Sequence, residues 1–307
     1  MENQQSKEVK MEPRISNGFL RSIIFMPMWL IIMGFVQAIA VVLIMVVSGV
    51  DMANPESAES FFSEMSFDSP IYLVLTAFSL LGSFLALWIA TKYIDRKPLE
   101  SIGLSMKDKG KEMLIGLAFA LAFIGGLFMI LWLIGAINVT GFVGFKPGVF
   151  IVSAMLFMAA FDEELIFRGY ILNNMMDSSK NRWIALGGSS LLFALMHAGN
   201  PSVWSNWVPM TELFAAGFIL GISYTFTKNL WFPTFFHFGW NFFQGLLGFE
   251  ISGINVDSWK MVAHENTGNV PDIISGGAFG IEGSVITLSC TIICTYFIFK
   301  YYNELEK

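Results

Sequence analysis

The segment FDEELIFRGY, residues 161–170, places three acidic residues and an arginine in an otherwise apolar stretch. Ionisable residues at membrane depth are rare and usually mark a functional site. Glu164 and Arg168 are four residues apart, so on a helix they share a face and can form an ion pair. Glu163 lies about 100° further round the same helix and can point elsewhere. We therefore expect Glu163 to carry chemistry and Glu164 and Arg168 to support it.

Two of the three histidines also lie in apolar segments. FALMH ends in His197 and HFGWN begins with His237. Within these segments Phe193 precedes His197 by four residues and Asn241 follows His237 by four, so each pair shares a helix face. Counted at about 1.5 Å per residue from the expected membrane boundaries, Glu163 and both histidines can lie in one layer. The third histidine, in an outer loop, is expected to be solvated.

A carboxylate and two imidazoles permit three chemistries. In the first, Glu163 and His197 activate a water for attack on an amide carbonyl, and His237 and Asn241 donate hydrogen bonds to the oxyanion. In the second, Glu163, His197 and His237 bind a metal, although no HExxH motif is present. The third is a proton relay in a transporter, although no two similar halves are evident. Simple polar contacts between helices contribute only about 0.6 kcal/mol on average, which makes a purely structural role a poor explanation.

Composition indicates an integral membrane protein. The chain has 307 residues, of which 55% are hydrophobic and 14% charged, and its mean hydropathy is +0.62. Soluble domains usually have about 25% charged residues. The lipid bilayer is therefore an expected partner. No basic patch or phosphate-binding glycine loop suggests nucleic acid. Cys290 and Cys294 share a helix face and are expected to pack as small apolar residues against a neighbouring helix.

The apolar segments predict an all-α fold, a polytopic bundle of about eight transmembrane helices. The expected spans are 20–49, 71–94, 113–137, 148–173, 183–198, 209–227, 230–249 and 284–301. Nearly all Lys and Arg residues fall on one side if both termini are cytoplasmic. The loop 51–70, by contrast, has five acids and no Lys or Arg. We expect a multi-pass protein of the cell membrane.

Four regions are predicted along the chain. They are a cytoplasmic tail (1–19), N-terminal transmembrane helices (20–145), a catalytic helical core (146–250) and an outer glycine-rich loop with the last helix (251–307). Gly217 and Gly221 have the GxxxG spacing that permits close helix contact. The loop 250–283 ends in SGGAFGIEGS and could either dip back toward the helices or form a flexible connection.

The polar motifs resemble those of a known family, the CAAX proteases and bacteriocin-processing enzymes of the CPBP or Abi group. Its EExxxR, FxxxH and HxxxN motifs correspond here to EELIFR, FALMH and HFGWN, in the same order and on separate predicted helices. The similar region spans about residues 148–249. The closing GGAFGIEGS is also similar to a segment of bacterial members.

The resemblance implies a glutamate-dependent intramembrane endopeptidase with no cofactor. By analogy Glu163 and His197 activate water, and His237 and Asn241 form the oxyanion site. Glu164, Arg168 and Phe193 are the implied supporting residues. The implied substrate is a peptide or a membrane protein. Eukaryotic members cut the last three residues from prenylated proteins, whereas bacterial members are linked to peptide processing and bacteriocin immunity. A zinc metalloprotease and a non-catalytic scaffold remain the alternatives.

Overall fold

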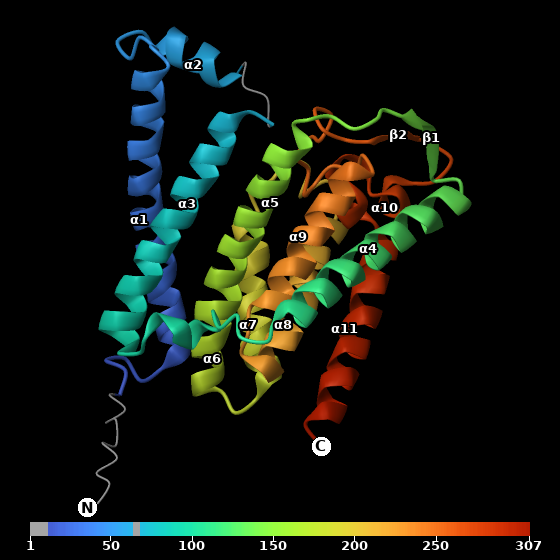
Figure 1. Ribbon diagram of the computed structural model, residues 1–307. Coiled ribbons are helices and arrows are strands. Elements are labelled where there is room, and N and C mark those ends of the chain that lie inside the picture. Colours follow the sequence, from blue (N-terminus) through green and yellow to red (C-terminus); the bar gives the residue numbers. More distant parts are fainter. Residues whose placement is uncertain (1–11, 64–67) are drawn as a thin grey trace, which may run out of the picture.

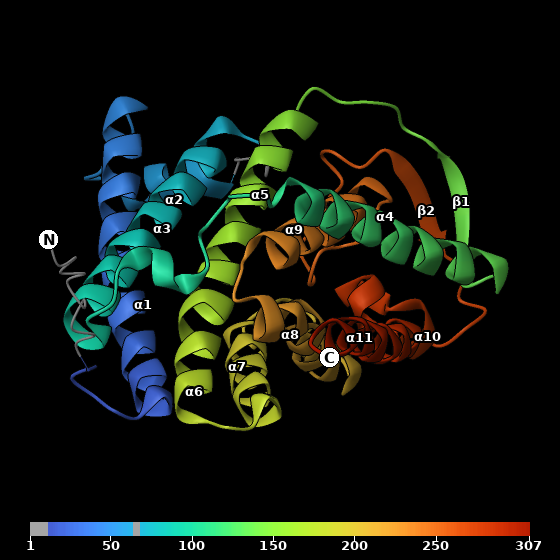
Figure 2. The ribbon, with the colours of Figure 1, turned by 60° about the horizontal axis from the view of Figure 1, so that its bottom comes forward.

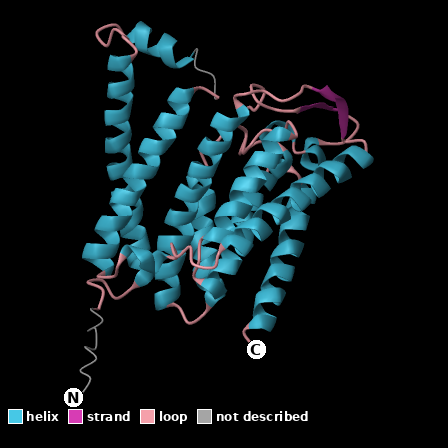
Figure 3. Cartoon of the chain, viewed as in Figure 1, coloured by secondary structure: helices cyan, strands magenta, loops and turns pink. Residues whose placement is uncertain are grey.

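A computed structural model describes residues 12–63 and 68–307, and they form a helical bundle with one small sheet (Figures 1 and 3). The mainly helical architecture predicted from the sequence is confirmed. The long helices are α1 (Gly18–Val47), α3 (Pro70–Ile89), α4 (Gly110–Leu133), α5 (Val149–Glu164), α7 (Arg182–Met196), α8 (Val208–Thr227), α9 (Trp231–Leu246) and α11 (Val285–Leu305). Shorter helices are α2 (Pro55–Ser63), α6 (Asn173–Ser178) and α10 (Asp272–Ser275). Most of the predicted tail and Glu64 of the acidic loop lie outside the described residues.

Five of the described helices are long and apolar enough to cross a membrane. They are α1, α3 with its extension to Asp95, α4, α8 and α11; α7 is apolar but shorter. The helices α5 and α9, which carry the polar motifs, are also short, so the count of eight spans stays a prediction. The start of α1 and the C-terminus lie at the same end of the bundle (Figure 1). The orientation of that end in the membrane stays a prediction.

Apolar side chains cover the outside of the bundle, as a lipid-facing surface requires. On α1, Ile31 is 73% exposed and Phe35 is 69% exposed; on α4, Leu114 is 70% exposed. Helix α4 packs along α9 and crosses it at an angle, which Figure 2 shows from one end of the bundle. The outer helices thus separate the polar interior from lipid.

Helix α8 is the most enclosed of the long apolar helices. Its Gly217 lies against Ser190 of α7, where an added Cβ would be 2.5 Å from the Ser190 Cβ atom. A Cβ at Gly221 of α8 would lie 2.6 Å from the side chain of Leu186, which is also on α7. The close helix contact expected from the GxxxG spacing is therefore confirmed, with α7 as the partner.

The helix that carries the acidic motif changes its winding directly after Glu164. Residues Leu165–Leu172 form a π-helical segment, and the chain continues without a break into α6. All eight residues of this segment are buried. Single π-helical turns within α-helices occur frequently at functional sites. The sequence predicted one continuous helix over 148–173, and the change of winding within it was not predicted.

The loops at the end of the bundle opposite the C-terminus are more ordered than the sequence indicated (Figure 1). Strands β1 (Ile137–Phe142) and β2 (Val262–Asn266) pair antiparallel, with Ile137 opposite Asn266. Both strands are too short to show a clear alternating pattern. The glycine-rich segment of the 250–283 loop packs inward, and Phe279 and Ile281 are fully buried. Of the two conformations left open for this loop, the inward one is found.

Gly276 and Gly280 make the inward turn possible. Their φ angles are 99° and 89°, in the left-handed region that favours glycine. A Cβ at Gly280 would be 2.1 Å from the carbonyl oxygen of Glu250, and one at Gly276 would be 2.0 Å from that of Gly280. The glycines therefore let three backbone segments approach closely, and this brings Glu282 into the interior.

Candidate active site

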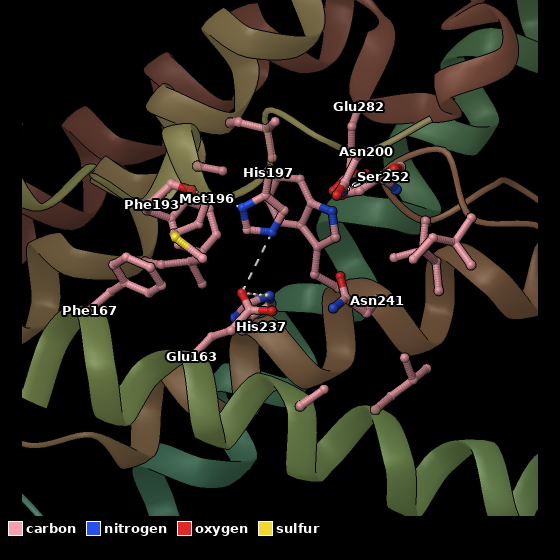
Figure 4. Close-up of a pocket in the computed structure, with 18 of the residues that line it drawn as sticks. Glu163, Phe167, Phe193, Met196, His197, Asn200, His237, Asn241, Ser252 and Glu282 are labelled. Atoms are coloured by element: carbon pink, nitrogen blue, oxygen red, sulfur yellow. Dashed lines mark hydrogen bonds and ion pairs between the residues drawn. The ribbon is translucent and has the colours of Figure 1, made fainter. Parts of the chain in front are cut away.

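Glu163, at the end of α5, faces two imidazoles from different helices (Figure 4). Its Oε2 atom is 3.8 Å from Nε2 of His197 and 3.9 Å from Nε2 of His237. These separations are too long for direct hydrogen bonds. All three side chains line one cavity of about 390 Å³. The structure thus brings together the carboxylate and histidines that the sequence predicted to share one layer.

Glu164 points away from this cavity into a buried cluster. Its Oε1 atom accepts a hydrogen bond from Nη1 of Arg168 and another from Nδ1 of His237, both at 2.9 Å. Nη2 of Arg168 also donates to the carbonyl oxygen of Gly217 at 3.3 Å. Glu164 and Arg168 are 0% and 1% exposed. The predicted ion pair is therefore present, and it connects α5 to both α8 and α9.

The same cluster fixes the tautomer of His237. A carboxylate paired with an arginine accepts hydrogen bonds, so Nδ1 of His237 carries a proton and donates it to Glu164. The Nε2 atom of His237 is left to face the cavity and Glu163. A neutral His237 can only accept a hydrogen bond there, whereas a protonated His237 can donate one.

His197 is held in the same way by the end of its own helix. Helix α7 ends at Met196, and the backbone N–H of His197 bonds to Ala194 rather than to Phe193. The Phe193 carbonyl instead accepts a hydrogen bond from Nδ1 of His197 at 2.9 Å. Side chains commonly satisfy the unpaired carbonyls of a helix C-terminus in this manner. Nε2 of His197 is therefore also left to face Glu163.

Phe193 has a second supporting role through its ring. The ring centroid lies 4.6 Å from that of His197 and 4.6 Å from the guanidinium carbon of Arg168. The phenyl face attracts the guanidinium electrostatically. Phe193 thus contacts both the histidine of its own FxxxH motif and the arginine of the EExxxR motif.

Asn241 lies one helical turn beyond His237 on α9, and it also lines the cavity (Figure 4). Apolar side chains form much of the remaining wall, among them Leu156, Leu213 and Ile251. An amide donor and two imidazoles therefore face one largely apolar space, where electrostatic interactions are stronger than in water.

Two carboxylates and one arginine lie beside the two imidazoles. Glu163 and Glu164 are negative and Arg168 is positive, so these three groups sum to one negative charge. Protonation of one histidine would offset that charge, and His237 is the histidine that faces both carboxylates. Across the described residues, no group of three or more His, Cys, Asp or Glu side chains has an arrangement that could hold a metal ion.

The cavity residues that were not predicted from the sequence include Asn200, Ser252 and Glu282. Asn200 follows shortly after His197, and Ser252 comes from the loop after α9. Glu282 is the only charged residue within the SGGAFGIEGS segment. An acid isolated among glycines was a usable signal, but the sequence did not show that this segment folds inward.

Comparison with protein families agrees with this geometry. Residues 144–243 match the family model of the Type II CAAX prenyl endopeptidases, described as Rce1-like. The matched segment includes all three polar motifs and the helices from α5 to most of α9. The resemblance predicted from the motifs is thereby confirmed for this segment, which indicates a CAAX-protease-type membrane endopeptidase. A search of curated proteins finds no match.

Proposed function

We propose that the protein is an intramembrane endopeptidase in which Glu163 activates a water molecule to hydrolyse a peptide bond. The observation that carries this proposal is the position of Glu163 Oε2 between two imidazole Nε2 atoms, at 3.8 and 3.9 Å. A hydrogen-bonded water needs about 2.8 Å to each partner. Glu163 Oε2 and either Nε2 atom are less than twice that distance apart, so a water can bridge the carboxylate and an imidazole.

The proposed reaction begins at Glu163 and His197. Neutral His197 accepts one hydrogen bond from the water at Nε2, because its Nδ1 proton is used by the Phe193 carbonyl. Glu163 accepts the other and removes that proton as the water oxygen attacks the carbonyl carbon of the peptide bond. Glu163 then returns the proton to the leaving nitrogen when the carbon–nitrogen bond breaks.

The negative charge that develops on the carbonyl oxygen needs hydrogen-bond donors. Protonated His237 supplies one from Nε2, while its Nδ1–H donates a hydrogen bond to Glu164. The Asn241 side-chain amide supplies a second from the next turn of α9. Donors held in place before the reaction stabilise the oxyanion without reorganisation. Arg168 serves this arrangement indirectly, because it holds Glu164 in place.

The proposed substrate is a peptide or a membrane-associated protein, and the proposed location is the cell membrane. The apolar wall of the cavity and the exposed apolar surface of the bundle suit a substrate segment that arrives from the lipid. A scaffold of the same fold would have no need for Glu163 to face two imidazoles across an open cavity.

The test compares cells that lack the protein with cells complemented by variants. Cells lacking it should accumulate an uncleaved peptide or membrane-protein precursor, detected by quantitative analysis of peptide termini. The wild-type protein and Glu59→Gln, a change on exposed α2, should remove the precursor. Glu163→Gln should not. Asn241→Ala should retain partial activity, because loss of one oxyanion donor typically costs about 10²–10³-fold in rate. Full rescue by Glu163→Gln would favour a scaffold.

A further inference from the structure

Glu282 is a second carboxylate in the wall of the cavity, and it has no assigned role in water activation. Glu282 is 7% exposed, and its hydrogen bonds are all accepted by one of its two carboxylate oxygens. Oε2 accepts hydrogen bonds from the backbone N–H of Ser252 at 2.6 Å, from the Ser252 hydroxyl at 3.0 Å and from Nε2 of Gln244 at 3.2 Å. Burial raises the pKa of the Glu282 carboxyl group, and the three donors to one oxygen act against burial by favouring the ionised form.

The other carboxylate oxygen has no donor among the described residues, although the carboxyl group lines the cavity. The described residues that line the cavity include no Lys or Arg. His197 is nearby, but its two nitrogens are directed to the Phe193 carbonyl and to Glu163. Buried carboxylates are normally paired with a cation, and this one has no Lys or Arg beside its second oxygen among the described residues, so that oxygen is suited to a cation that enters the cavity.

Asn200 adds an acceptor at the same place. Its Nδ2 atom donates to the Ser252 carbonyl at 3.2 Å, which leaves Oδ1 as an acceptor. Figure 4 shows Asn200, Ser252 and Glu282 grouped on the side of His197 away from Glu163. The cavity thus has water-activating groups on one side and an acceptor pair on the other.

We propose that Glu282, with Asn200, is a specificity-determining subsite that binds an ammonium or guanidinium group of the peptide substrate. The inference rests on the proposed function, because it treats this cavity as the place where the substrate binds. It adds a substrate class: peptides with a positive charge near the scissile bond. The charge can come from a Lys or Arg side chain or from a free N-terminus.

The experiment uses the full-length protein in lipid nanodiscs and a random library of N-acetylated, C-amidated peptides. Mass spectrometry identifies the best-cleaved peptide with a Lys or Arg near the cleavage site. Matched versions then replace that residue with norleucine or glutamate, and one version has a free N-terminus in place of the basic side chain. For the wild-type protein, kcat/KM should be roughly 10- to 100-fold higher for the basic peptide than for its norleucine version, as expected for a hydrogen bond to a charged group.

Glu282→Gln should reduce this ratio to near one, and Glu282→Asp should restore part of it. Ser252→Ala is the matched control, because it removes one hydrogen bond to Glu282 and keeps the charge; the basic peptide should stay preferred. If the free N-terminus replaces the side chain without loss, the ammonium group bound is the peptide amine. An equal loss for both peptides in Glu282→Gln would overturn the proposal and leave a structural role.

Peptide binding to Glu163→Gln separates this inference from the proposed function. Glu163→Gln should bind a fluorescent basic peptide more tightly than its norleucine version, and the double variant Glu163→Gln/Glu282→Gln should lose that preference. If the preference is present but the wild-type protein hydrolyses nothing, the subsite stands and the peptidase function fails. If hydrolysis occurs with no preference for the basic peptide, the peptidase function stands and the subsite is wrong.

Discussion

At the scale of single residues, the site divides into groups that face the cavity and groups that hold them. Glu163 and the two Nε2 atoms face the open space. Glu164 and the Phe193 carbonyl accept the Nδ1 protons and thereby fix both rings. Hydrogen bonds of this kind determine which imidazole nitrogen is available for chemistry. The EExxxR and FxxxH motifs therefore each combine a residue that faces the cavity with one that positions a histidine or its partner.

Arg168→Ala should reduce stability strongly. It leaves Glu164 buried with only His237 as a hydrogen-bond partner, and removal of one member of a buried ion pair typically costs about 3–5 kcal/mol. The measurement is thermal unfolding in detergent. Arg182→Ala is the control, because the Arg182–Glu306 pair is partly exposed and such pairs contribute about 0–1 kcal/mol. Equal unfolding temperatures for both variants would show that the buried ion pair contributes no more to stability than the partly exposed one.

At the scale of elements, helices and motif spacing could be predicted, but their exact winding and the loops could not. Apolar runs fix where helices form, and four-residue spacing correctly indicated the Glu164–Arg168 pair and the Phe193–His197 contact. The π-helical turn after Glu164 depends on the packing of neighbouring helices, which no local pattern records. Glu282 points inward because three backbone segments approach closely at glycines. These segments are far apart in the sequence, so the conformation of the loop could not be predicted.

The contact between α7 and α8 gives a prediction at this scale. Gly217→Ala should destabilise the protein by about 1–3 kcal/mol, because the added Cβ would overlap Ser190 and its backbone. It should also lower activity, since the Gly217 carbonyl accepts a hydrogen bond from Arg168. Gly125→Ala on α4 is the matched control, with nothing within 4 Å of the added Cβ. Thermal unfolding and peptide hydrolysis measure both effects, and a Gly217→Ala protein as stable as Gly125→Ala would contradict the packing argument.

At the scale of the whole molecule, the bundle encloses a polar cavity behind an apolar surface, and the loops close one end. The β1–β2 sheet and the 250–283 loop lie at this end (Figure 1). His264 of β2, the third histidine of the chain, packs on Phe249 with ring centroids 4.4 Å apart, and its ring nitrogens are buried without a hydrogen-bond partner among the described residues. The expectation that this histidine is solvated is therefore wrong. Burial, with a further contribution from Lys260, lowers the pKa of His264 to about 4.

This depressed pKa predicts that the loop end loses stability in acid. Folded His264 stays neutral down to about pH 4, whereas the unfolded chain takes up the proton below about pH 6.5. Because the unfolded state binds more protons in that window, stability should fall as pH decreases from about 6.5 to about 4. His264→Phe should reduce the fall by a few degrees in unfolding temperature. An identical pH profile for His264→Phe and the wild-type protein would show that His264 titrates normally.

The central claim is that Glu163 activates water for peptide hydrolysis, and purified protein tests it most directly. Hydrolysis of a peptide library in nanodiscs should be abolished by Glu163→Gln, with unfolding temperature and size-exclusion profile unchanged, and retained by Glu59→Gln. The wild-type activity should persist in EDTA and 1,10-phenanthroline. Normal cleavage by Glu163→Gln would contradict the account. Loss of wild-type cleavage under chelation, restored by zinc, would favour a metalloprotease.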